Sequence, residues 1–294
     1  MFTKKKREIV DHRRTVPERI FFAIFFTVLA IWAFLMLSMF FWAVASALKT
    51  NLDYVREPLK LPSLANLQWK NFKVATERLN HNGVGFYGML WNSTWLVCGS
   101  TFLSVFMHVM VGYFLAQYDF KGKNLILAIV IFITIIPIYG SLPAMYKLIY
   151  DLHLNDSYWY LLTALGGYSS TVLITYGYFK GIPRTYREAV YVDGGSDITA
   201  FIKIGLPMSK SIFIALFLLS FIHGWNNYET SILYFDSMPS LASGLYYFQQ
   251  EIIYEANNPA YFAGAIMAML PILLLFIFFS DKIMGKMYSG GIKG

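Results

Sequence analysis

Long apolar runs, separated by short polar segments, dominate the chain. A run can cross a bilayer as a helix if it has about 20 apolar residues, because a rise of about 1.5 Å per residue then spans roughly 30 Å of hydrocarbon. The runs that meet this requirement cover residues 20–48, 86–118, 124–146, 157–179, 211–233 and 260–280. Backbone polar groups in lipid must be bonded within the segment, and the alternation typical of a membrane barrel is absent. The pattern therefore predicts an all-α, polytopic membrane protein with six transmembrane helices.

Composition supports this fold class. Hydrophobic residues make up 57% of the chain and aromatic residues 18%, whereas only 14% are charged, which is far from the balance of a soluble globular domain. The first run is too long for a cleaved signal peptide and lacks a small-residue cleavage site, so we expect it to remain as a span. The single cysteine, Cys98, lies inside an apolar run. We therefore expect neither a disulfide framework nor a metal site.

The basic residues predict the topology. Lys and Arg are concentrated in the first 19 residues and in alternate loops, while residues 234–259 contain neither. By the positive-inside rule both ends of the chain lie in the cytoplasm. We expect a cytoplasmic segment of residues 1–19, a transmembrane domain of residues 20–284 and a cytoplasmic tail of residues 285–294. The net charge of +7 then reflects topology and attraction to anionic membrane lipid, and no nucleic acid is expected as a partner.

A polar stretch between the fourth and fifth runs is unlike its surroundings. Residues 188–207 read EAVYVDGGSDITAFIKIGLP and belong to an expected cytoplasmic loop of residues 181–210. Thr185 with Glu188 three residues later fits a capping box, which satisfies amide donors at a helix start. The stretch therefore predicts a short helix, a sharp break and a second helix.

The break and the second helix have their own signals. Gly194 and Gly195 would end the first helix, and Ser196 is a suitable cap for the next. Pro207 would mark the entry to the fifth span, with the preceding residue biased away from helical conformation. The loop is therefore expected to be folded.

Two interpretations of such a loop remain open on physical grounds. The small side chain of Ala189 would let another protein approach the helix closely, which favours a docking element. Alternatively, the helix lies on the lipid headgroups with Tyr186, Val190 and Tyr191 as its buried face.

The same stretch resembles the signature of permease subunits in ATP-binding cassette importers. That signature is Glu-Ala-Ala, three residues, Gly, nine residues, and Ile-x-Leu-Pro. Only Val190 departs from it, replacing the second Ala with a bulkier apolar group. The positions that correspond to the signature are Glu188, Ala189, Val190, Gly194, Ile204, Leu206 and Pro207.

This resemblance implies a fold, a location and partners. Nearly the whole chain is similar to the carbohydrate-uptake branch, which includes the smaller maltose permease subunit and oligosaccharide permeases such as that of an alginate importer. It implies the type I ABC importer permease fold in the bacterial cytoplasmic (inner) membrane. The implied partners are a second, different permease, a dimer of ATP-binding cassette ATPases and an extracytoplasmic solute-binding protein, which the outer loop of residues 49–85 would contact. Glu188 would pair with polar or basic ATPase groups, and Ala189 would face the ATPase cleft.

Two weaker resemblances extend the comparison. The segment Gly224 to Tyr228 is similar to a Trp-Asn-x-aromatic element of sugar permeases. The ending SGGIKG resembles a tail that reaches between the ATPase subunits, which implies ATPase contacts for Gly290, Gly291 and Lys293. Sugars are bound by aromatic faces and hydrogen-bonding groups, so the candidates for the substrate pathway are Tyr176, Trp225, Asn226, Asn227, Tyr228 and Glu229. Interfacial aromatic residues and helix packing offer the alternative explanation.

Other functional classes are less compatible with the sequence. No glycine-rich loop ends in Gly-Lys-Ser or Gly-Lys-Thr, so ATP and Mg²⁺ are expected on partner subunits and no enzymatic activity or cofactor on this chain. An ion-coupled carrier would need acids deep in the membrane, yet Glu229 lies only toward the outer end of the fifth run, and His108 and His223 are isolated. An intramembrane hydrolase would show Gly-x-Ser-x-Gly or His-Glu-x-x-His, and neither occurs.

Overall fold

The computed structural model describes residues 15–136, 140–166, 170–255 and 257–287. Within these residues the chain is helical apart from one short hairpin, which confirms the all-α fold class. The helices that are long and apolar enough to cross a membrane are Val16–Ala47, Phe86–Gln117, Asp197–Trp225 and Asn258–Phe279.

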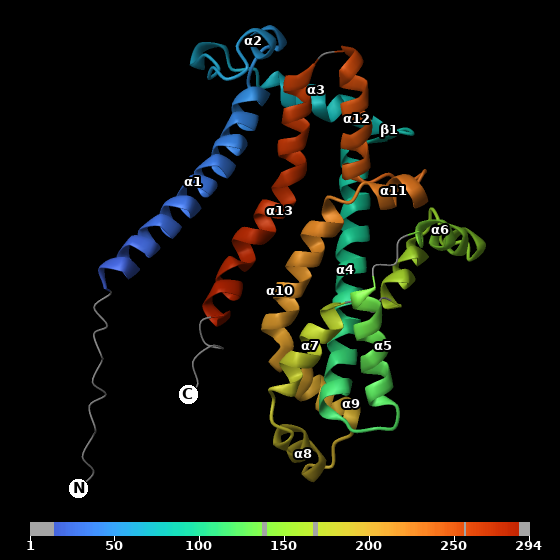
Figure 1. Ribbon diagram of the computed structural model, residues 1–294. Coiled ribbons are helices and arrows are strands. Elements are labelled where there is room, and N and C mark those ends of the chain that lie inside the picture. The colour runs from blue at the N-terminus through green and yellow to red at the C-terminus, as the bar shows by residue number, and fades with distance from the viewer. Residues whose placement is uncertain (1–14, 137–139, 167–169, 256, 288–294) are drawn as a thin grey trace.

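The elements follow one another along the chain with short connections (Figure 1). In order they are α1 (Val16–Ala47), α2 (Asn51–Arg56), η1 (Leu64–Asn66), α3 (Lys70–Arg78), β1 (Asn80–His81), β2 (Val84–Gly85), α4 (Phe86–Gln117), α5 (Lys123–Ile135), α6 (Leu142–Asp151), η2 (Tyr158–Leu165), α7 (Ser170–Lys180), α8 (Thr185–Val192), α9 (Asp197–Ala200), η3 (Phe201–Gly205), α10 (Leu206–Trp225), α11 (Glu229–Tyr234), α12 (Leu241–Glu255) and α13 (Asn258–Met287). The two strands pair antiparallel, with His81 opposite Val84.

Three of the six expected spans are not continuous helices in the described residues. In the fifth run, α10 ends at Trp225 and a separate helix, α11, begins at Glu229. The third run divides into α5 and α6, and the fourth into η2 and α7. Ile136, which precedes Pro137 in the sequence, is extended with φ −86° and ψ 112°, as expected for a residue before proline. The fourth run begins as a 3₁₀-helix that ends at Gly166. Apolarity decides whether a segment enters lipid, but proline and glycine decide whether its helix is unbroken.

Helix α4 is the centre of the bundle. It packs against α7, η2, α10 and α12, and Figure 1 shows it running the length of the molecule between α10 and α5. On one half of α4, Val105, Val109 and Tyr113 pack with Phe179 of α7 and Phe201 of η3 in one buried cluster. The hydroxyl of Thr175, on α7, donates to the carbonyl oxygen of His108 at 2.8 Å, which binds the two helices closely at this crossing.

The opposite half of α4 belongs to a second core. Met89 and Val97 pack there with Trp225 of α10, Phe248 of α12 and Ala263 of α13. Helices α8 and α9 cover one end of the bundle, whereas α2, α3, the hairpin and α12 gather at the other end (Figure 1). The loop expected in the cytoplasm and the segments expected outside therefore lie at opposite ends.

Helix α1 stands apart from the bundle. It packs against α13 and leans away from α4 and α10 (Figure 1). Most of its large apolar side chains are exposed, including Phe25, Trp32 and Leu37. The hydroxyls of Thr27 and Ser38 donate to the backbone carbonyl oxygens of Ala23 and Leu35 in the same helix, each at 2.8 Å. These features are those of a helix that is surrounded by lipid or by another membrane subunit.

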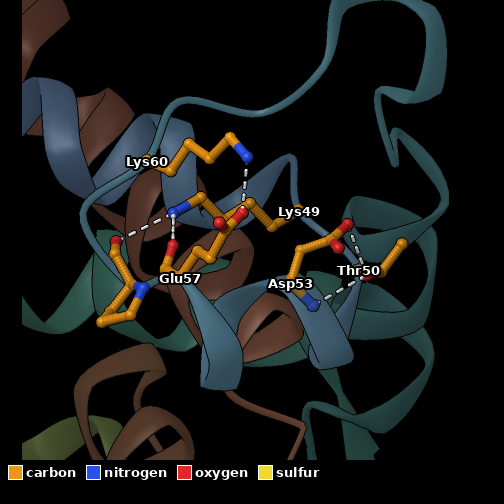
Figure 2. Close-up of polar contacts among 6 residues, drawn as sticks. Lys49, Thr50, Asp53, Glu57 and Lys60 are labelled. Carbon is orange, nitrogen blue, oxygen red and sulfur yellow. Dashed lines mark hydrogen bonds and ion pairs between the residues drawn. The ribbon is translucent and has the colours of Figure 1, made fainter.

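A buried lysine holds the turn that follows α1 (Figure 2). The Lys49 ammonium donates to the carbonyl oxygens of Glu57 at 3.1 Å and Pro58 at 2.8 Å. Trp42 of α1 donates its indole N–H to the same Pro58 oxygen at 2.8 Å. Burial lowers the pKa of Lys49, an effect that the charges of Asp53 and Glu57 oppose. The segment from α1 to α3 is therefore an ordered cap on this end of the molecule.

Candidate functional site

The polar loop forms a helix, a turn and a second helix, as its sequence predicts. Helix α8 covers Thr185–Val192, but its N-cap is Arg184, which already has helical φ and ψ and makes no side-chain cap. The expected capping box of Thr185 and Glu188 is therefore wrong, because Thr185 is the first residue inside the helix and not the residue before it.

The end of α8 is a Schellman motif. Gly194 takes φ +77°, its amide donates to the carbonyl of Tyr191 at 3.0 Å, and the amide of Gly195 donates to that of Val190 at 2.8 Å. These bonds satisfy carbonyls that a helix end leaves free. The Ser196 hydroxyl then accepts from the amide of Thr199 at 3.3 Å. Both the glycine stop and the serine cap are confirmed.

The signature residues divide into two groups by the direction in which they face. Glu188 and Ala189 are exposed on α8, so they are available to another molecule. Ile204 and Leu206 are partly buried, and Leu206 packs against the cluster that joins α4, α7 and η3. The signature therefore combines a free outer face with an inner face that anchors it to the bundle.

The departure at Val190 has a local explanation. A Cβ atom on Gly195 would lie 2.4 Å from Cγ1 of Val190, so the valine side chain occupies the space that glycine leaves open. Tyr191 also turns toward the protein, since its hydroxyl donates to Asp197 and contacts the Tyr118 hydroxyl at 3.3 Å. Val190 and Tyr191 therefore have contacts within the protein. Of the three residues that would face lipid in the alternative interpretation, this leaves only Tyr186.

No break separates the loop from the span that follows. Residues Asp197–Trp225 form one helix of 29 residues, in which η3 is a π-helical turn just before Pro207. Leu206 is helical, with φ −63° and ψ −50°, so the expected bias away from helix at this residue is wrong. The wider π turn accommodates the proline ring and its missing amide hydrogen. The fifth span therefore begins earlier than residue 211 and ends at Trp225.

A cavity lies between α4, η2, α7 and α10. It has a volume of about 520 Å³, and its lining contains eight hydroxyl side chains together with His223 and Asn227. The hydroxyl groups belong to Ser100, Thr101, Ser104, Tyr160, Thr163, Thr171, Ser220 and Thr230. Thr101 is near the middle of α4, roughly 22 Å from either end at 1.5 Å per residue. The cavity therefore brings hydrogen-bonding side chains together at mid-depth along a largely apolar helix.

A second hollow, of about 520 Å³, adjoins the first at the far end of α10. Four of the six pathway candidates line it: Asn226, Asn227, Tyr228 and Glu229. Asn227 and His223 line both spaces. The Asn227 side chain also accepts from the amide of Thr230 in the first turn of α11, at 2.9 Å.

The structure places the other two candidates elsewhere. Trp225 is buried, and its indole N–H donates to the carbonyl of Ala268 in α13 at 2.9 Å. Tyr176 packs between α4, α5 and α7, with the Lys180 ammonium 5.8 Å from its ring centroid. Neither residue lines the cavity. The tail candidates Gly290, Gly291 and Lys293 lie outside the described residues.

Sequence reasoning missed the hydroxyl groups of α4 because serine and threonine are common in membrane helices. One signal was present. Ser100 and Ser104 are four residues apart, so they share a face of α4, and the structure brings that face to Ser220 on α10. Within the described residues, no group of three or more His, Cys, Asp or Glu side chains could hold a metal ion.

Comparison with known proteins agrees with the class that the signature loop indicates, the membrane permeases of importers. The family of binding-protein-dependent transport system inner membrane components matches residues 108–283. An arabinooligosaccharide transport system permease of Bacillus subtilis is 30% identical over 218 residues, which are 74% of this chain and 77% of the relative. A diacetylchitobiose uptake system permease of Streptomyces coelicolor is 24% identical over 277 residues, or 93% and 89% of the two chains. A maltose/maltodextrin transport system permease of Vibrio parahaemolyticus is 31% identical over 216 residues, or 70% and 72%.

Proposed function

Because the chain belongs to the family of binding-protein-dependent transport system inner membrane components, we propose that it is the membrane-spanning permease subunit of an ATP-driven oligosaccharide importer. The observation that carries this proposal is that a single helix links the signature loop to the cavity. The second part of the signature, from Ile204 to Pro207, and one wall of the hydroxyl-lined cavity both belong to the continuous helix Asp197–Trp225, and α8 with the first part of the signature precedes that helix directly.

The proposed coupling starts at the exposed face of α8. Glu188 and Ala189 are free on the surface, and the apolar side chains of Val192 and Ile198 beside them are 88% and 67% exposed. An exposed acid with neighbouring apolar groups is suited to a cleft on a cytoplasmic ATPase, where Glu188 meets a basic group. ATP and Mg²⁺ are bound there, on the partner subunits.

Closure of the ATPases is then passed to the cavity through a stiff element. The helix Asp197–Trp225 is about 43 Å long at 1.5 Å per residue. Its first turn lies in the loop, and its last three turns carry Leu216, Ser220 and His223 to the cavity. A displacement at the loop therefore moves the cavity wall as a rigid body, which is how two-state transport movements arise.

The chemistry of the cavity favours a neutral oligosaccharide. Its lining residues include no Asp, Glu, Lys or Arg, so they provide hydroxyl, amide and imidazole hydrogen bonds but no charge for a uronate chain such as alginate. The printed names of the relatives refer to arabinooligosaccharides, diacetylchitobiose and maltodextrin. Substrate would reach this chain from an extracytoplasmic solute-binding protein, and a second, different permease would complete the pathway.

The same absence of charge weighs against an ion-coupled carrier. Such a carrier needs ionisable groups that change partners in the membrane, whereas α4 and α10 contain no Asp or Glu. Glu229 begins α11, beyond the end of the long helix.

The test is uptake by the complete importer in proteoliposomes, with labelled arabino- and maltooligosaccharides offered separately. We expect uptake of at least one of them to require ATP on the ATPase side and to continue when ionophores collapse the proton and sodium gradients. A uronate oligosaccharide of equal length should not be taken up. Uptake that needs an ion gradient and proceeds without ATP would refute the importer proposal.

A further inference from the structure

The end of α4 and the residues that connect it to α5 contact α8, the first helix of the loop of residues 181–210, which we call the coupling loop. The guanidinium of Arg187, on α8, donates to the carbonyl oxygen of Gln117 at the end of α4. Its Cζ atom lies 4.4 Å from the ring centroid of Tyr118 and 5.7 Å from that of Tyr191. A guanidinium this close to aromatic rings is attracted to their faces by its charge and can also stack on them through its planar group.

Gln117 extends this contact to α7. Its side chain is almost fully buried, and its amide nitrogen donates to the carbonyl oxygens of Phe179 at 2.7 Å and Ile182 at 3.0 Å. The last residue of α4 is therefore bonded to the end of α7 by its side chain and to α8 by its backbone. Because of these hydrogen bonds, a displacement of α8 exerts a force on the end of α4.

A charged pair lies beside the stacked group. Asp119 accepts from Arg184 at 2.5 Å and from Lys123 at 3.0 Å. These two partners lower the pKa of Asp119 to about 2, so the carboxylate is ionised throughout the physiological range. The side chains of Arg184 and Asp119 are 47% and 66% exposed, and water and salt weaken such a pair. The stacked Arg187 is only partly exposed, so it holds α8 more firmly than the exposed pair.

We propose that Arg187, clamped by Gln117, Tyr118 and Tyr191, is a positioning residue that passes the movement of the coupling loop to α4. This set of four residues is called the Arg187 joint. The inference rests on the proposed function, since it assigns a second path for the same coupling. The helix Asp197–Trp225 moves one wall of the cavity, and the Arg187 joint moves a second wall, because Ser100, Thr101 and Ser104 lie on α4. Both walls then respond to one ATPase.

The experiment measures substrate uptake and ATP hydrolysis by the reconstituted importer, with the amount of bound ATPase determined in the same samples. Arg187→Met removes the charge and the stacking. We expect the ATPase to remain bound and to hydrolyse ATP, while sugar transported per ATP falls about tenfold, which is within the usual range of a coupling free energy between sites. Arg187→Lys keeps the charge but not the planar stacking, so its loss should be intermediate.

Two substitutions on the other side of the joint keep the test independent of Arg187. Tyr118→Leu removes the stacking surface and should reproduce the uncoupling, whereas Tyr118→Phe keeps the ring and should transport nearly as the wild type does. Lys203→Met is the matched control, because Lys203 is an exposed base in η3 of the same loop and should leave the ratio unchanged.

Three results would overturn the proposal. First, Arg187→Met or Tyr118→Leu could transport as much sugar per ATP as the wild type. Second, Arg187→Met could lose the bound ATPase itself, which would make Arg187 a docking contact. Tyr118→Phe could also uncouple as strongly as Tyr118→Leu, which would exclude stacking as the cause. Failure of the proposed function is distinguishable, because the wild-type chain would then bind no ATPase at all.

Discussion

At the scale of single residues, the structure surrounds a buried charged group, the ammonium of Lys49, with backbone carbonyl oxygens. Lys49 lies just after the long apolar helix α1, yet only 3% of its surface is exposed. A lysine in such a position loses the hydration of its ammonium, and backbone carbonyls at the turn replace part of it. The sequence shows only a lysine at the end of an apolar run, so its burial depends on the distant turn at Glu57 and Pro58, which no local pattern predicts.

We predict that Lys49→Met loosens this turn and Lys60→Met does not. The first substitution removes two charge-assisted hydrogen bonds, each typically worth about 2 kcal/mol. Lys60 makes only an exposed pair with Glu57, at 2.7 Å and with side chains 69% and 54% exposed, which contributes little. Hydrogen–deuterium exchange across residues 57–60 should increase in the first variant alone. Equal exchange in both variants would contradict the assigned role of Lys49.

At the scale of elements, prediction succeeded where the signal was local. The apolar runs at α1, α4 and α13 gave the spans, and Gly194 with Ser196 gave the turn between α8 and α9. The continuous helix through Pro207 could not be predicted, because a π turn depends on packing of η3 against α4. Helix α12 was also missed, although its buried Leu241, Phe248 and Ile252 are spaced as one helical face.

The packing of Val190 against Gly195 leads to a prediction about the turn itself. Gly195→Ala should impair uptake, because its Cβ would meet Val190 Cγ1 at 2.4 Å and the Val190 carbonyl oxygen at 3.0 Å. Overpacking of this kind typically costs about 1–3 kcal/mol. Val190→Ala, which restores the Glu-Ala-Ala triplet, should be tolerated alone.

The double variant tests whether the two positions are coupled. Val190→Ala with Gly195→Ala should recover part of the lost uptake, since the side-chain clash disappears and only the carbonyl contact remains. Additive losses in the double variant would show that Val190 does not occupy the space beside Gly195.

At the scale of the whole molecule, the function depends on residues that are distant in the sequence. The class of the protein could be predicted from apolar runs and one loop, because membrane insertion and docking motifs are local properties. The cavity could not be predicted, because it forms only where α4, η2, α7 and α10 meet. Trp225 was proposed for the pathway from its motif, yet tertiary packing directs its indole to α13.

The central claim is that this chain is a permease driven by a separate ATPase. The most direct measurement is to purify the tagged chain from cells that express its native partners, in mild detergent, and to identify and quantify the proteins that accompany it. We expect an ATPase with a phosphate-binding loop and a second permease, with two ATPases for each permease pair. Glu188→Lys should lose the ATPase but keep the second permease. If the wild-type chain purifies alone under conditions that keep a known importer intact, the account is contradicted.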